Sequence, residues 1–398
     1  MRADGTRGAD RAIWFLAAAQ TIIWAGIYYS FPALLVQWEA ALGWSKTDLT
    51  LCFTSAVAAS ALSSPLAGRL IDRGHGPLIL AGAAFCGGLL VGSLSFVNSY
   101  PLFWLIWVLI GVMMSACLYE PCFALVMRAR GINAKRSITL ITLVAGFAST
   151  LSFPMAHVLS EAIDWRAATL GFGLFVCCAG APLAWFGAHL LEGEKRSADA
   201  RTRPVPVQST HRFLRHPAFW LLAIGFALMA LNHGIVLNHF LPLMDERRFD
   251  PAIAVFAASM IGPMQVAGRL AMMALERHVT IHAITMASFT AVSCATLFLL
   301  GAEAVPVLVI GYVVLQGSGY GVTSIMKPVV TRDILGEQNF GAITGAMAVP
   351  YLAAFAFAPY LGSVLWEIGG YDLALWTAFT ATLTGLVFYL IASRWRAR

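Results

Sequence analysis

Charged residues are scarce in this chain of 398 residues, because aspartate, glutamate, lysine and arginine together make up only 12% of it. Hydrophobic residues make up 59%, and the mean hydropathy is +0.75. Apolar runs of about 18 residues or more recur along the whole length, which leaves no room for a soluble domain of ordinary size. Inside a bilayer the backbone must satisfy its own polar groups, so continuous runs predict helices rather than the alternating strands of a barrel. The sequence therefore predicts an all-α polytopic membrane protein with about 12 transmembrane helices.

Catalytic and nucleotide-binding motifs are also missing. No Walker motif occurs, and no nucleophile, metal or cofactor constellation is visible. The run Gly317-Ser-Gly-Tyr-Gly321 has the glycines of a phosphate loop, but it lies in an apolar span and favours close helix packing. The seven cysteines lie mostly inside apolar runs, without the spacing of metal or redox sites. We therefore expect that the protein is not an enzyme and binds no cofactor or metal. If it moves a solute, we expect gradients to drive that transport.

The basic residues indicate a membrane topology. The net charge is +6, but the lysines and arginines are scattered over short loops instead of forming a face for nucleic acid. Most of them lie at the two termini and in the loops after even-numbered spans, whereas the opposite loops carry Lys46, Arg166, Arg247 and Arg248. We expect the protein to lie in the inner (plasma) membrane. By the positive-inside rule, we expect both termini to lie in the cytoplasm. The apolar segment after residues 1–10 is too long for a signal-peptide core, so we expect it to be the first helix.

Hydropathy divides the predicted helices into two sets of six. The predicted spans are roughly 12–36, 48–68, 76–97, 101–127, 137–160, 166–191, 217–242, 251–275, 279–301, 304–328, 341–366 and 373–393. The stretch 192–216 is polar, basic and proline-bearing, which is typical of a linker. We therefore expect an N-terminal six-helix bundle in residues 1–191, a cytoplasmic linker, and a C-terminal six-helix bundle in residues 217–398.

A short polar run between the second and third predicted spans is the most specific motif. Its glycines allow a tight turn, and its charges need an aqueous face. The run contains Gly68, Arg69, Leu70, Asp72 and Arg73 in that order. It resembles the loop signature of the major facilitator superfamily. The resemblance implies two six-helix bundles that rock about a central substrate site. It also implies that Gly68, Arg69, Asp72 and Arg73 act in gating, with Asp72 locking the cytoplasmic side in one state.

Further segments resemble the monocarboxylate-porter and oxalate-formate-antiporter-like branch of that superfamily. They are Tyr28-Tyr29-Ser-Phe31, Gly43-Trp44-Ser45, Tyr119-Glu120-Pro121, Gly146-Phe-Ala-Ser-Thr150, Asp164-Trp165-Arg166 and the run from Gly262 to Arg269. The resemblance implies that Arg269 binds a substrate carboxylate. The sequence departs from this branch in two places. Residues 341–366 contain no cation, whereas the dicarboxylate antiporters carry one there, and this disfavours exchange of dianions. Gln265 stands where the animal monocarboxylate carriers have an aspartate.

Three charged residues inside the predicted spans are candidate functional residues, because a charge there costs several kcal/mol unless it faces water or a partner. Arg269 could hold a substrate anion, or it could snorkel to the surface or form a gate salt bridge. Lys327 could contact the anion or snorkel. Glu120 could carry a proton, because burial favours the protonated carboxyl group, or it could be the structural partner of an arginine.

Uncharged candidates complete the predicted site. His233 and Gln265 could bind the substrate or hold polar packing contacts. Trp24, Tyr28 and Tyr119 fall deep in the first and fourth spans and could stack on a flat substrate, with helix packing as the alternative.

The sequence thus predicts a proton-linked secondary transporter, a symporter, that imports a small organic acid of the monocarboxylate type. Arg269 would hold the anion and Glu120 would carry the proton. Import of a flat vitamin-type nutrient such as riboflavin is one alternative, and efflux of a metabolite or drug is another. The expected partners are the small-molecule substrate and membrane lipid, with no nucleic acid. By resemblance, we expect a monomer.

Overall fold

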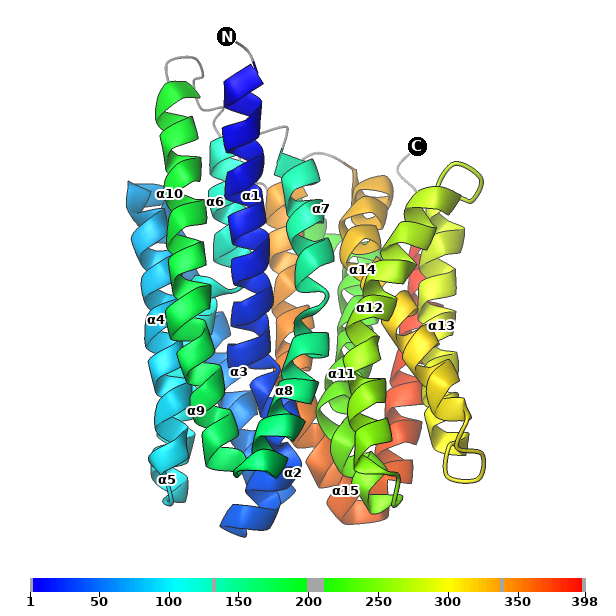
Figure 1. The fold of residues 1–398 in the computed structure, drawn as a ribbon. Helices are drawn as coiled ribbons and strands as arrows, with labels where there is room; N and C mark the ends of the chain where they lie inside the picture. Colours follow the sequence, from blue (N-terminus) through cyan, green and yellow to red (C-terminus); the bar gives the residue numbers. More distant parts are fainter. Residues whose placement is uncertain (1–2, 131–133, 199–210, 337–339, 396–398) are drawn as a thin grey trace. The chain divides into compact units, whose positions relative to one another are not determined.

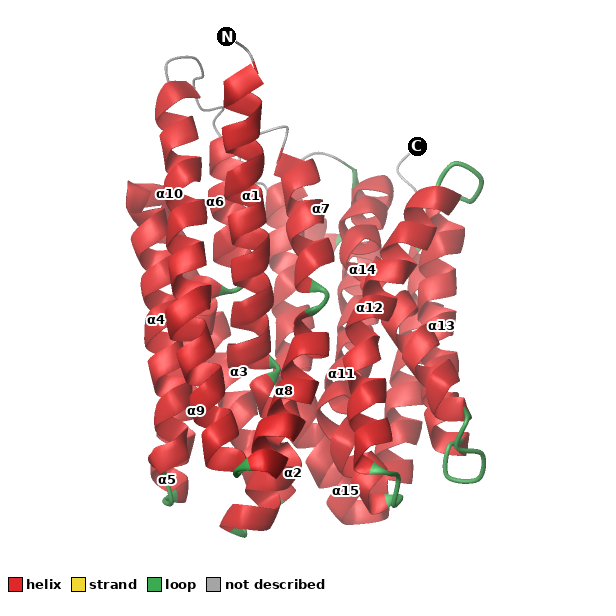
Figure 2. Cartoon of the chain, viewed as in Figure 1, coloured by secondary structure: helices red, strands yellow, loops and turns green. Residues whose placement is uncertain are grey.

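The computed structural model describes residues 3–130, 134–198, 211–336 and 340–395, and these are helical, with short connections and no strand (Figures 1 and 2). The all-α prediction is therefore confirmed. The chain divides into two compact units, Met1–Pro204 and Val205–Arg398. The predicted linker 192–216 lies partly outside the described residues, which resume at 211 after the last helix of the first unit.

The described part of the first unit contains ten α-helices, and four consecutive pairs of them form longer spans. They are α1 (Ala3–Ile23), α2 (Ser30–Leu42), α3 (Lys46–Leu70), α4 (Gly76–Ser93), α5 (Tyr100–Cys117), α6 (Tyr119–Arg130), α7 (Ala134–Ala145), α8 (Ala148–Ala162), α9 (Trp165–Phe175) and α10 (Ala181–Ala198). Three π-helical segments, Trp24–Tyr28, Ile71–His75 and Val176–Gly180, connect α1 to α2, α3 to α4 and α9 to α10. Within this unit α1 packs against α10 and α7, and α4 packs against α5, α9 and α10 (Figure 1).

The second unit contains longer, less interrupted helices. They are α11 (Pro217–Glu246), α12 (Pro251–Leu275), α13 (Ile281–Gly301), α14 (Leu308–Leu335) and α15 (Phe340–Ala392). The backbone of α15 leaves the helical region at Gly369 and Gly370, and Gly370 has a φ of +70°. A residue with a side chain is strained at such a φ, so these glycines allow the turn between two consecutive spans. Within the unit α11 packs along α15, and α14 packs against both α12 and α13.

Ten helical stretches among the described residues are long and apolar enough to cross a bilayer. One of them, Gly345–Ala392, has 48 residues, which is about twice the length of a single crossing. The break at Gly369 divides this stretch into the two spans that the sequence predicts there. α3 is a further helix of 25 residues. With this division and α3, the described helices account for the twelve that were expected.

A buried glutamine supports the break between α5 and α6. Pro121 has no N–H, so it cannot donate to the carbonyl of Cys117 four residues before it. The backbone leaves the helical region at Leu118, with φ −82° and ψ −157°. The side chain of Gln20, which is fully buried in α1, donates to the Cys117 oxygen over 2.9 Å. The hydrogen bond that proline removes from the helix is thus replaced from another span.

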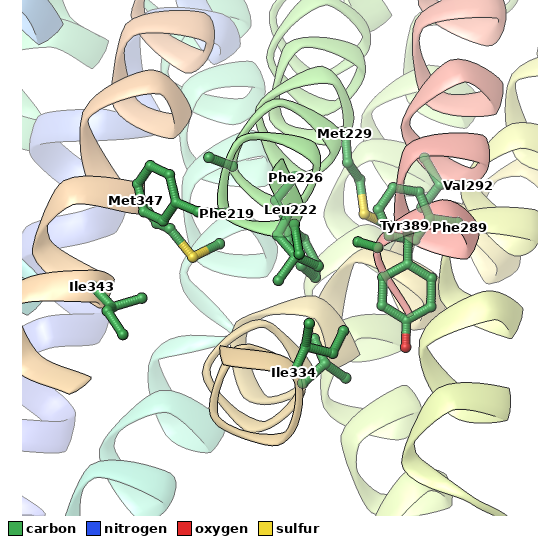
Figure 3. Packing of buried hydrophobic residues seen from close by; sticks show 14 residues of the cluster. Phe219, Leu222, Phe226, Met229, Phe289, Val292, Ile334, Ile343, Met347 and Tyr389 are labelled. Atoms are coloured by element: carbon green, nitrogen blue, oxygen red, sulfur yellow. The ribbon is translucent and has the colours of Figure 1, made fainter. Parts of the chain in front are cut away.

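The second unit has an apolar core between four helices (Figure 3). Phe219, Leu222, Phe226 and Met229 point from α11 toward side chains of α13, α14 and α15. These α11 residues follow the three- and four-residue spacing that places side chains on one helix face. The buried Tyr389 of α15 lies in this core beside the ring of Phe289, with 5.9 Å between centroids.

Arginines tie helix ends together on the side that the charge pattern predicts to be outside. In the first unit Arg166 donates to the Ser95 carbonyl over 2.5 Å and to Asn98 over 2.6 Å. In the second unit Arg247 donates to the Leu299 carbonyl over 2.6 Å and to Asp372 over 2.8 Å. Two of the four cations predicted on that face therefore hold helix ends together.

Candidate functional site

The aromatic candidates of the first unit form one cluster. The ring centroid of Trp24 lies 5.0 Å from that of Tyr28 and 4.7 Å from that of Tyr119. Tyr119 in turn stacks on Phe123, with 5.0 Å between centroids and 13° between planes. The indole N–H of Trp24 is buried, and it has no hydrogen-bond partner among the described residues. The structure therefore brings together the three aromatic residues that the sequence singled out.

Two irregular backbone segments place these rings. Trp24 and Tyr28 are the first and last residues of the π-helical segment between α1 and α2, and Tyr119 begins α6 just after the break at Leu118. The hydroxyl of Ser152 in α8 donates to the Ala25 carbonyl over 3.0 Å and so stabilises the π-helical segment from a neighbouring span. Single π-helical turns inside α-helices are frequent at functional sites, because they turn side chains away from the regular helix faces.

Glu120 does not have the environment that we expected. It is exposed, so the expectation that the span buries it is wrong. It lies in the first turn of α6, where the partial positive charge of a helix N-terminus stabilises a negative side chain. Proton transfer by Glu120 would depend on other contacts, and it stays a prediction.

The predicted gating loop has the tight turn that its glycines indicated. It is the π-helical segment Ile71–His75, in which Gly74 has a φ of +91°. Arg128, at the end of α6, donates to the Ile71 carbonyl and so attaches the loop to the fourth span. The side chain of Arg73 is exposed.

The other gating candidates give less information. Gly68 lies near the end of α3 in open space, where an added Cβ would meet no atom within 4 Å. The side chains of Arg69 and Asp72 lie outside the described ones. The gating roles of all four residues stay predictions.

Arg269 lies in the second unit, at a close contact between α12 and α14. Its Nε donates to the carbonyl of Gly321 over 2.9 Å, and only 6% of the residue is exposed. A Cβ on Gly321 would lie 2.5 Å from the carbonyl oxygen of Gln265, and one on Gly268 would lie 2.4 Å from that of Ser318. Glycines on both helices therefore allow the backbones to approach, and this approach brings the Gly321 carbonyl within reach of Arg269. The interpretation of Gly317–Gly321 as a packing segment agrees with these distances.

His233 belongs to a buried polar group between α11 and α14. Its Nδ1 lies 3.3 Å from Nε2 of Gln316. The neighbouring Asn232 donates to Thr296 over 2.9 Å and to the Ala378 carbonyl over 3.0 Å. All of these side chains are buried, so their polar atoms depend on one another for hydrogen bonds.

Lys327 is half-buried, and its ammonium group lies on an aromatic ring. Nζ is 3.6 Å from the centroid of Tyr351 in the eleventh span. The hydroxyl of Tyr351 lies 2.6 Å from that of Tyr320, and the Tyr320 ring stacks on His233 with 3.4 Å between centroids. Contacts therefore continue from Lys327 to His233 through two tyrosines.

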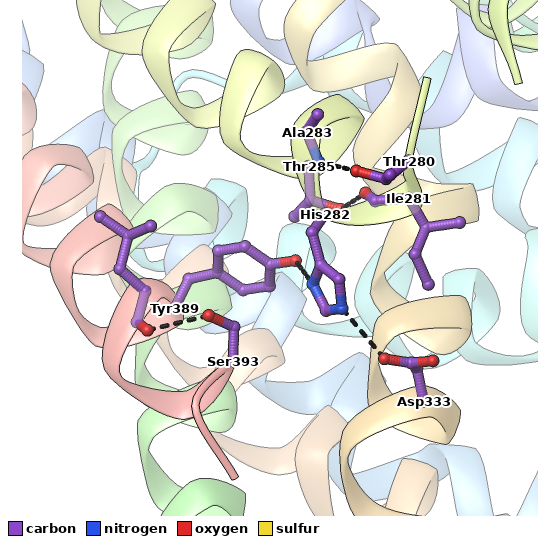
Figure 4. A network of polar contacts seen from close by, with 9 residues as sticks. Thr280, Ile281, His282, Ala283, Thr285, Asp333, Tyr389 and Ser393 are labelled. Atoms are coloured by element: carbon purple, nitrogen blue, oxygen red, sulfur yellow. Dashed lines mark hydrogen bonds and ion pairs between the residues drawn. The ribbon is translucent and has the colours of Figure 1, made fainter. Parts of the chain in front are cut away.

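The sequence did not single out several residues that contact these candidates. Tyr320 and Tyr351 were passed over because isolated tyrosines in spans carry no distinctive pattern. His282 was also missed. Its Nδ1 is hydrogen-bonded to the Tyr389 hydroxyl over 2.6 Å, and its Nε2 to an Asp333 carboxylate oxygen over 3.0 Å (Figure 4). These bonds connect the ends of α13, α14 and α15. The position of His282 two residues after the capping Thr280, in the first turn of a helix, was the available signal.

Comparisons with known proteins agree with this architecture. A family model described as Major Facilitator Superfamily matches residues 14–302. Monocarboxylate transporter 12 of Xenopus laevis is 24% identical over 313 residues, which are 71% of this chain and 67% of that protein. Monocarboxylate transporter 12-B of Danio rerio is 26% identical over 285 residues, or 63% of this chain and 57% of that protein. The chain thus spans somewhat more than half of the length of the second relative.

A solved structure shares the fold. It is a bacterial homolog of the human lysosomal transporter Spinster, in an inward-facing and occupied conformation, with a TM-score of 0.68 and 14% sequence identity. The similarity covers 97% of this chain and 98% of that one. Proteins of the matched family are transporters and not enzymes. Because the family match extends over most of the 398 residues, this chain belongs to the major facilitator superfamily.

Proposed function

We propose that this transporter imports a small organic acid of the monocarboxylate type across the inner membrane, by alternating access and together with protons. The observation that carries the proposal is the buried guanidinium of Arg269 within an apolar span. An arginine keeps its positive charge in proteins, and inside a bilayer that charge is costly unless it has a function. The printed names of the two relatives, both monocarboxylate transporters, support the same substrate class.

The position of Arg269 suits a carboxylate. The bond from Nε to the Gly321 carbonyl orients the planar guanidinium and limits the rotation of a flexible side chain. The two terminal nitrogens of an arginine form the fork that matches the two oxygens of a carboxylate. A group oriented before the substrate arrives loses less conformational entropy on binding. Gln265, one turn earlier on α12, adds an uncharged hydrogen-bonding group to the same helix face.

Substitution of Arg269 tests this role. Arg269→Gln keeps a polar side chain but removes the charge, so we expect carboxylate affinity to fall by about 10- to 100-fold. Arg269→Lys keeps the charge without the fork, and we expect an intermediate loss. Affinity is read from the KM of labelled lactate uptake into proteoliposomes, with protein insertion verified by protease protection. Unchanged affinity in Arg269→Gln would contradict the anion-anchor role.

The aromatic cluster of the first unit favours a second candidate, import of a flat nutrient of the riboflavin type. The rings of Trp24, Tyr28 and Tyr119 lie against one another, and the buried indole N–H of Trp24 is a hydrogen-bond donor. Aromatic faces stack on planar ligands. Riboflavin would then quench the tryptophan fluorescence of the wild-type protein, and the Trp24→Phe variant would lose part of that quenching. Lactate would cause no quenching under the same conditions.

A further inference from the structure

The sequence places no cation in residues 341–366 of the eleventh span, yet the structure brings one to it. The ammonium of Lys327, from the tenth span, lies 3.6 Å from the ring centroid of Tyr351. A lysine near a helix end usually extends toward water, because its charge is strongly hydrated. The ring face of a tyrosine attracts a cation, and this attraction is larger where water is excluded. Tyr351 thus opposes snorkelling of Lys327.

The spacing along both helices fixes this arrangement. Tyr320 and Lys327 are seven residues apart, so they lie on one face of α14 about 10 Å apart along the axis. Tyr351 of α15 contacts both, with its ring against the ammonium and its hydroxyl 2.6 Å from that of Tyr320. The Tyr351 ring therefore lies between two side chains of the same α14 face.

The other end of this group is anchored in buried structure. The ring of Tyr320 stacks on His233 at 3.4 Å and 11°, and His233 is only 3% exposed. Gln316, one turn before Tyr320 on α14, lies 3.3 Å from the histidine Nδ1. The position of Tyr351 is therefore set by a hydroxyl contact to a tyrosine that is itself held by a buried histidine.

We propose that Tyr351 is a positioning residue that holds the Lys327 ammonium ready for the anionic group of the substrate. This proposal rests on the proposed import of an organic acid. Tyr351 presents its ring to the ammonium, and the Tyr320 hydroxyl keeps that ring in place. The anion then binds an ammonium that the ring still holds and that has already lost most of its rotational freedom.

The test compares variants in proteoliposome uptake of labelled lactate, with KM and maximal rate measured separately. Tyr351→Leu removes the ring, and we expect KM to rise about five- to twentyfold with a smaller change in maximal rate. Lys327→Met should cause a similar rise. The double variant should be no worse than Lys327→Met alone, because Tyr351 acts on the substrate only through Lys327.

Conservative variants separate positioning from packing. Tyr351→Phe keeps the ring and loses the hydroxyl, and Tyr320→Phe loses the other member of that pair. We expect both to raise KM by the same small factor, about two- to threefold. Tyr360→Leu, in the same span, is the packing control and should leave KM unchanged.

The outcomes are distinguishable. An unchanged KM in Tyr351→Leu would overturn the proposal. A double variant whose rise in KM is the product of the two single rises would also overturn it. The proposed function would survive either result, provided that Arg269→Gln still loses affinity. If the wild-type protein takes up no lactate, pyruvate or formate, the proposed function fails, and the positioning role fails with it.

Discussion

A single missing N–H sets the local structure of the fourth span. Pro121 cannot donate to the Cys117 carbonyl, and Gln20 donates to it in place of the backbone. In a bilayer an unsatisfied carbonyl finds no water, so a neighbouring helix has to satisfy it. The bond also holds the start of α6, which carries Tyr119 and Glu120, against α1. Gln20 is thus a structural residue that positions candidate site residues.

Gln20→Leu should destabilise the protein by about 1–2 kcal/mol, in the range of interhelical hydrogen bonds in membranes. The measurement is the free energy of unfolding in detergent, followed by circular dichroism. Pro121→Ala provides the matched background, because it restores a backbone N–H that can serve the Cys117 carbonyl. Gln20→Leu should cost less in that background. An equal cost in both backgrounds would show that Gln20 does not act through this carbonyl.

Individual site residues could be predicted where their chemistry is unusual for a membrane span. Arg269, Lys327 and His233 were singled out on that basis, and the structure places all three in polar or cation–π contacts. The partners were not predictable. Gln20 and Cys117 are 97 residues apart, and nothing local in either segment indicates their contact. The exposure of Glu120 was missed for a related reason, since span membership does not specify which face of a helix is covered.

At the scale of helices, glycines determine how closely α12 and α14 approach. A Cβ added at Gly268 or at Gly321 would clash with backbone atoms of the opposite helix, which cannot move aside as a flexible side chain could. The close contact allows the bond between Arg269 and the Gly321 carbonyl. Packing of small residues is a main source of helix association in membranes. The same contact therefore stabilises the unit and orients the proposed anion ligand.

Gly321→Ala should force α12 and α14 apart, at a cost of about 1–3 kcal/mol. Because the Arg269 bond depends on this approach, we also expect a higher KM for the transported carboxylate. Thermal unfolding and uptake kinetics of the same preparations measure the two effects. Gly345→Ala is the control, since an added Cβ there meets no atom within 4 Å. Equal stability of both variants would contradict the packing account.

Helix positions could be predicted from hydropathy, but their interruptions could not. The predicted second-unit spans at 217–242 and 251–275 match α11 and α12 closely. The π-helical segment at Trp24–Tyr28 and the break at Leu118 have no hydropathy signal, because apolar residues continue through them. Pro121 was the available indication for the second. These interruptions matter because they place the aromatic candidates.

At the scale of the whole molecule, a superfamily fold combines with side chains that suit the proposed anion transport. The two compact units and the family match give the architecture of a secondary transporter. The first unit offers an aromatic cluster, and the second offers Arg269, Lys327 and a buried polar group. The charges favour an organic acid as substrate, whereas the aromatic cluster favours a flat nutrient.

Uptake into proteoliposomes with an imposed proton gradient measures whether the protein imports an organic acid together with protons. The wild-type protein is given labelled lactate, pyruvate, succinate and riboflavin in parallel, with and without a protonophore. We expect accumulation of a monocarboxylate that collapses when the protonophore is added and is lost in Arg269→Gln. Accumulation of riboflavin alone, unaffected by Arg269→Gln, would contradict it and would assign substrate binding to the aromatic cluster of the first unit.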